Sequence, residues 1–154
     1  MLIFYQLWIT VALSWGKNSH CKSKISTIQR RAARLILNKP KRSASCKLLG
    51  EVEWLSFDDR CKYHTALLVF KTMQNDAPQY MCDILKFSAN KMHHLRSESN
   101  KNLILPAKPR TNYYKKSFSY NSFNVWNSIP ISIKMSRNVQ TFKSRCKKYY
   151  LKQK

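Results

Sequence analysis

Residues 56–74 read SFDDRCKYHTALLVFKTMQ, and this pattern indicates a helical fold. Ser56 precedes Asp59 by three positions, which is the pattern of a capping box: the hydroxyl accepts from a free amide of the first turn, and the acid reaches back. Apolar or aromatic residues cover much of the predicted helix, and they include Phe57, Cys61, Leu67, Leu68, Val69 and Phe70. We therefore expect this helix at the centre of the core, with His64 packed there rather than acting as a ligand or base.

A second helix is predicted over 22–38, with two different faces. Apolar residues recur at helical spacing, while arginines gather on the opposite side. The apolar residues are Ile25, Ile28, Ala32, Leu35 and Ile36, and the arginines are Arg30, Arg31 and Arg34. Because guanidinium groups match phosphate oxygens in geometry, the arginine face is a candidate for phosphate contact. An ordinary solvated face is the alternative.

Another basic helix is predicted over 138–152. Its apolar and aromatic positions keep helical spacing, at Val139, Phe142, Cys146, Tyr149 and Tyr150. Lysines and arginines surround this stripe, and cations in the last turn suit the helix dipole. Among them, Lys147 and Lys148 are candidates for contact with an anionic partner.

The region between these helices is less regular. Residues 88–102 are polar without periodicity and predict a loop, and 103–130 predict a strand and turn segment that starts at the apolar Leu103. Within it, basic residues interleave with aromatic ones. The basic residues are Arg110, Lys115 and Lys116, and the aromatic residues are Tyr113, Tyr114, Phe118 and Tyr120. Such a segment offers phosphate attraction and rings for stacking on unpaired bases; a strand with inward-facing aromatics is the alternative.

Together these patterns predict a mainly α fold: one small, truncated helical domain over 1–154 with a short β-strand or hairpin element. Residues 1–15 are nearly all apolar, and we interpret them as the remnant of an upstream element. The run is too short to span a bilayer, so no membrane span is expected. It also lacks the preceding positive residues and the clear cleavage pair of a signal peptide, since Ser14 and Trp15 close it.

Charge is divided unevenly along the chain, whose formal net charge is +22. All seven acidic residues lie between Glu51 and Glu98, whereas positions 1–50 carry ten basic residues and positions 99–154 carry thirteen. Two acid-free basic blocks repel each other and are stabilised by a polyanion, so RNA or DNA is the first partner expected. An anionic membrane surface, an acidic protein partner and a secreted cationic toxin are the alternatives.

Residue types that support catalysis or metal binding are poorly placed. The five cysteines lie at least fifteen residues apart, which opposes a zinc site and fits free thiols in a reducing compartment, nuclear or cytoplasmic. With only Gly16 and Gly50, the chain cannot form a glycine-rich phosphate loop. Asp58 and Asp59 are expected to serve the helix cap rather than a metal pair. The chain is therefore expected to have no catalytic residues, no metal, no cofactor and no small-molecule substrate.

Several motifs, in this order, resemble the C-terminal, post-polymerase region of jockey-like non-LTR (LINE-type) retrotransposon reverse transcriptases. The resemblance covers about residues 13–151. It rests on Trp15 and Gly16, IQRRAARLI at 28–36, Trp54 and Leu55, Arg60 with Lys62, Tyr63 and His64, APQY at 77–80, LRS at 95–97, the segment 105–113, SFSY at 117–120, WNSIP at 126–130, and Phe142 and Lys143 with Lys147, Lys148 and Tyr149.

The resemblance implies a parent protein that is an RNA-directed DNA polymerase with an endonuclease, both absent from this chain. It further implies that the segment helps to position template RNA or target DNA, and that the upstream polymerase domain is its partner. The chain by itself is then not an enzyme. On this interpretation Met1 falls inside continuous family sequence, so a nonfunctional gene-model fragment is an alternative. A secreted cationic protein, cleaved near Ser14 or Trp15, is a further but less favoured one.

Overall fold

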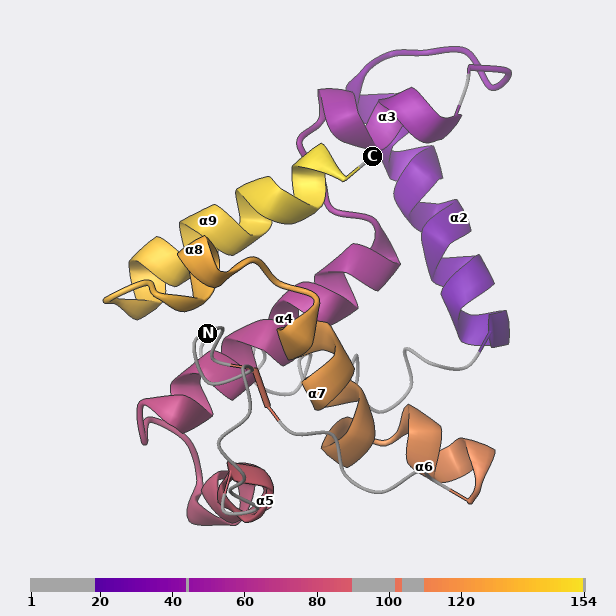
Figure 1. The fold of residues 1–154 in the computed structure, drawn as a ribbon. Coiled ribbons are helices and arrows are strands. Elements are labelled where there is room, and N and C mark those ends of the chain that lie inside the picture. Colours follow the sequence, from indigo (N-terminus) through magenta and orange to yellow (C-terminus); the bar gives the residue numbers. More distant parts are fainter. Residues whose placement is uncertain (1–18, 44, 90–101, 104–109, 154) are drawn as a thin grey trace. The chain divides into compact units, whose positions relative to one another are not determined.

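The computed structural model describes residues 19–43, 45–89, 102–103 and 110–153 (Figure 1). Their regular structure is helical, which confirms the mainly α class, and no strand occurs among these residues. The helices are α2 (Ser19–Ile36), α3 (Ser45–Glu51), α4 (Phe57–Met73), α5 (Gln79–Ala89), α6 (Asn112–Lys116), α7 (Phe118–Asn127), α8 (Ile131–Lys134) and α9 (Val139–Lys152). The apolar start 1–15 and most of the loop predicted over 88–102 lie outside the described residues.

The chain divides into two compact units. The first comprises Met1–Tyr63 and Cys146–Lys154, and the second comprises His64–Arg145. The division falls within α4 and within α9, so each of these helices contributes residues to both units.

In the first unit, a small core forms between α2 and α3. Ala33, Leu48 and Leu49 are buried there, and Leu37, Val52 and Trp54 pack against them. The chain leaves α2 through Asn38, whose φ of 48° is in the left-handed region that asparagine tolerates at a helix end. Next to this turn, the amide of Lys39 donates to the carbonyl oxygen of Arg34 at 3.0 Å. These contacts end the helix just before Pro40, which could not continue it.

The apolar stripe of α2 is not the face that packs against this core. Leu35 is 83% exposed, and Ile28 and Ile36 are also exposed, whereas Ala33 is fully buried. The packed face carries polar contacts as well: Gln29 Nε2 donates to the carbonyl oxygen of Leu55 at 2.6 Å. Amphipathic spacing therefore identified the helix, but the buried face is centred on Ala33.

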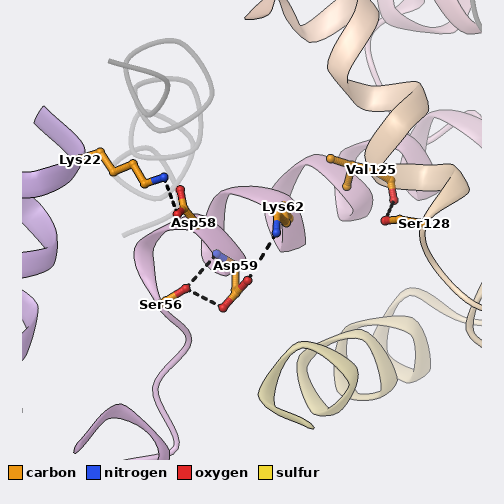
Figure 2. A network of polar contacts seen from close by, with 7 residues as sticks. All are labelled: Lys22, Ser56, Asp58, Asp59, Lys62, Val125 and Ser128. Atoms are coloured by element: carbon orange, nitrogen blue, oxygen red, sulfur yellow. Dashed lines mark hydrogen bonds and ion pairs between the residues drawn. The ribbon is translucent and has the colours of Figure 1, made fainter. Parts of the chain in front are cut away.

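The start of α4 has the cap expected from its sequence (Figure 2). Ser56 Oγ accepts from the backbone amide of Asp59 at 3.2 Å, and it donates to Asp59 Oδ2 at 2.5 Å. Lys62 Nζ lies 3.8 Å from Asp59 Oδ1, and Lys22 Nζ lies 2.5 Å from Asp58 Oδ2. Both acids lie in the first turn of α4, where negative charge is favourable near a helix N-terminus, and Asp58 also links this turn to α2.

Aromatic side chains from three helices form the core of the second unit. The rings of Phe70 on α4 and Phe142 on α9 stack with centroids 4.3 Å apart, and Trp126 on α7 lies 6.0 Å from Phe142. All three side chains are buried. Offset and stacked aromatic pairs of this kind add to the free energy gained from burial.

The segment predicted as strand and turn over 103–130 is different in the structure. Residues 104–109 lie outside the described residues, and much of 112–127 is helical in α6 and α7. In α7 the buried residues are Ser122, Phe123, Val125 and Trp126, which is the spacing of a helix rather than of a strand. The expected short β element is therefore not found in the described part of this segment.

The backbone amide and carbonyl of Leu103 are both hydrogen-bonded, but their partner is a side chain and not another strand. Its backbone amide donates to Asn127 Oδ1 at 2.9 Å, and Asn127 Nδ2 donates to its carbonyl oxygen at 2.9 Å. The neighbouring Asn102 accepts from Lys134 Nζ at 2.7 Å. One side chain therefore satisfies both backbone groups of Leu103, which would otherwise need other partners.

Candidate nucleic-acid interface

Within the described parts of the chain, four of the seven acidic residues form ion pairs with lysines. Lys39 pairs with Glu51, Lys71 with Asp76, and α4 begins with the paired Asp58 and Asp59 described above. Positions 99–154 contain no acid at all. Basic side chains on α6, α8 and α9 therefore have no carboxylate neighbour in their own stretch of sequence.

The three predicted arginines of α2 are not equivalent. Arg31 is exposed, whereas Arg30 and Arg34 are partly buried. Arg30 Nε donates to the carbonyl oxygen of Ser26 at 3.1 Å, and Arg34 Nη2 donates to that of Ser43 at 3.5 Å. One nitrogen of each of these two guanidinium groups thus donates within the first unit, and Arg31 is the most exposed of the three arginines.

On α9 the predicted lysines lie on the solvent side. Phe142, Cys146 and Tyr150 are almost completely buried, at the four-residue spacing of one helical face. Lys147 and Lys148 are exposed, and so is Lys152, which follows Lys148 by one turn. Lys152 was not among the predicted site residues, although its i+4 spacing from Lys148 was visible in the sequence.

The third predicted group is gathered on and beside α6. Arg110, Lys115 and Lys116 are all exposed, as are the rings of Tyr113 and Tyr114. Thr111 caps this short helix, because its hydroxyl oxygen accepts from the amide of Tyr114 at 3.3 Å. The interleaved cations and aromatics therefore lie on a helix, and the strand with inward-facing rings does not form.

The candidates fall into three groups by the element on or beside which they lie. Arg30, Arg31 and Arg34 share α2, and Lys147 and Lys148 share α9. Arg110, Lys115 and Lys116 belong to the second unit.

One lysine of the acid-free stretch, Lys134, is buried. Lys134 is only 5% exposed, and its Nζ lies 5.7 Å from the centroid of the Trp126 ring. Burial lowers the pKa of this amine from its ordinary value, because the charged form loses solvation. The burial of Lys134 could not be predicted from the sequence, because this lysine lies in the same acid-free basic block as the exposed lysines. It serves the core of the second unit rather than an outside partner.

Side chains that could hold a metal ion do not cluster in the described parts of the chain, and two of the thiols are buried. No three His, Cys, Asp or Glu side chains among the described residues gather as a metal ion requires. Cys82 and Cys146 are buried, and burial raises the pKa of the Cys146 thiol to about 12. A thiol with such a pKa is protonated at neutral pH and a poor nucleophile.

No helix among the described residues has both the length and the apolar character needed to cross a membrane. Comparisons with protein-family models, with curated proteins and with solved structures find no match for this chain.

Proposed function

We propose that this chain binds RNA or DNA electrostatically and does not itself catalyse a reaction. The observation that carries the proposal is the exposure of Lys147 and Lys148 on α9, opposite a buried face and in a stretch without acids. The cations on and beside α6 are also exposed and also lie in a stretch without acids. A phosphate backbone binds such lysines by releasing its condensed counterions, which requires no pocket and no cofactor.

The order of motifs supports a specific origin for this activity. We assign the chain to the post-polymerase region of a non-LTR retrotransposon reverse transcriptase, where it would help to hold template RNA or target DNA beside the polymerase domain. The free thiols of Cys21, Cys82 and Cys146 support a nuclear or cytoplasmic setting. Genomic sequence upstream of Met1 tests the origin: it should encode the polymerase, in frame or with a frameshift, and unrelated sequence there would contradict it.

Binding of the full chain to fluorescein-labelled RNA and DNA, measured by anisotropy across a salt series, tests the activity. A plot of log affinity against log salt should be linear, with a slope of about −0.7 to −0.9 for each phosphate neutralised. A flat response would contradict the proposal.

A charge-matched pair of variants locates the contact. Lys147→Ala with Lys148→Ala should weaken binding more than Lys39→Ala with Lys62→Ala, although both remove two positive charges. The control lysines already pair with Glu51 and Asp59, so they are less available to phosphates. Equal losses in the two double variants would show that net charge alone, and no particular surface, drives binding.

A further inference from the structure

The two adjacent tyrosines of α6 have different surroundings. Tyr114 is 42% exposed, and its ring lies against that of Tyr120 on α7, with centroids 6.2 Å apart and planes inclined by 49°. Tyr113 is 89% exposed. The Tyr114 ring thus packs against another ring of its own unit. The Tyr113 ring instead projects into solvent, from a helix whose two ends are held by hydrogen bonds.

Both ends of α6 are held by local hydrogen bonds. Thr111 caps the start, and at the end the amide and the hydroxyl of Ser117 donate to the carbonyl oxygen of Tyr114 at 3.1 and 2.7 Å. A tyrosine side chain has few rotatable bonds, so a ring on such a turn is presented at low entropic cost. An exposed apolar ring in this setting is unfavourable in water and is stabilised when a flat partner covers it.

Cations border the exposed ring on the helix surface. Lys116 follows Tyr113 by three positions, so the two side chains are neighbours on one side of α6, and Arg110 is exposed just before the helix. No acid occurs between positions 99 and 154. A partner that fits this surface must therefore combine a flat aromatic face with nearby negative charge.

We infer that Tyr113 stacks on an unpaired base while Lys116 and Arg110 meet the adjoining phosphates, so that this surface takes single-stranded nucleic acid. The inference rests on the proposed function and deepens it. In a duplex the faces of the bases are covered by their neighbours, whereas an unpaired strand offers both a free face and the phosphates beside it. Tyr113 is therefore a binding residue that distinguishes single strands from duplexes.

The test compares two probes with the full chain at one salt concentration. One probe is an oligouridylate of about 15 nucleotides, near the upper end of the site sizes of single-strand binders, and the other is the same strand annealed to oligoadenylate. Tyr113→Ala should weaken binding of the single strand about tenfold, the effect of losing one stacked base. It should change binding of the duplex by less than about twofold, because phosphate contacts remain.

Two further variants serve as controls. Tyr113→Phe keeps the ring and should bind the single strand like the wild type. Tyr80→Ala removes another exposed tyrosine, on α5 and 65% exposed, and should also leave binding unchanged. Loss of binding in Tyr113→Phe, or an equal loss in Tyr80→Ala, would contradict a stacking site on α6.

The outcomes separate this inference from the function on which it rests. If wild type binds both probes but Tyr113→Ala has no effect, or weakens both probes equally, the stacking site is wrong, and electrostatic binding is then judged by the salt series described above. If wild type binds neither probe, both proposals fail. If polyglutamate binds with the same dependence on Tyr113, the surface serves an acidic protein and the stacking inference is overturned.

Discussion

α2 and α9 are both basic helices with an apolar stripe, but the structure uses the stripes differently. On α9 the repeated positions Phe142, Cys146 and Tyr150 are almost completely buried. On α2 the stripe residues Leu35 and Ile36 are exposed, and the fully buried position is Ala33. Amphipathic spacing thus establishes that a segment is helical, whereas tertiary packing determines which of its faces is buried.

The cations of the two helices differ in the same way. Arg30 and Arg34 of α2 donate to backbone carbonyl oxygens of their own unit. Lys147 and Lys148 of α9 are exposed. Similar charge density in the sequence therefore produces one helix whose arginines support the fold and another whose lysines are available to a partner.

Truncating one residue of each stripe should give the largest contrast between the helices. Phe142→Ala should lower the free energy of unfolding by about 3–5 kcal/mol, because it opens a cavity beside Phe70 and Trp126. Leu35→Ala should change it by less than about 0.5 kcal/mol, as expected for an exposed side chain. Urea denaturation followed by circular dichroism measures both. A larger loss for Leu35→Ala than for Phe142→Ala would reverse the assignment of the buried faces.

A smaller effect should follow from the polar contact that holds α2. Gln29→Ala removes the donor to the carbonyl oxygen of Leu55 and should lower the free energy of unfolding by about 1 kcal/mol. Lys24→Gln, an exposed change on the same helix, is the control and should stay within about 0.5 kcal/mol. The same urea titrations decide the result. If Gln29→Ala matches its control, this polar contact does not hold α2 in place.

Long periodic segments of this chain could be predicted well from the sequence. The helix expected over 56–74 is α4 at Phe57–Met73, and that expected over 138–152 is α9 at Val139–Lys152. Their signals are local, since the cap at Ser56 and the spacing of the apolar residues both act within a few turns. Such signals do not depend on the rest of the fold.

The region 103–130 could not be predicted in the same way, because its structure depends on distant partners. Leu103 is paired by the side chain of Asn127, twenty-four positions away, and no local pattern indicates that bond. Phe118 and Tyr120 alternate as in a strand, yet both lie on the helix α7.

The candidate site was likewise only partly visible in the sequence. Charge indicated Lys147 and Lys148, which are exposed, but equally Arg30 and Arg34, which bind their own backbone.

The salt dependence of nucleic-acid binding by two double variants tests the central claim most directly. Lys147→Gln with Lys148→Gln and Arg30→Gln with Arg34→Gln remove equal charge from α9 and from α2 and keep good helix-forming residues. The slope of log affinity against log salt should become shallower by about 1.4–1.8 in the α9 variant, as expected for two lost phosphate contacts, and by less in the α2 variant. Equal slopes in the two variants, or a larger change in the α2 variant, would contradict the account.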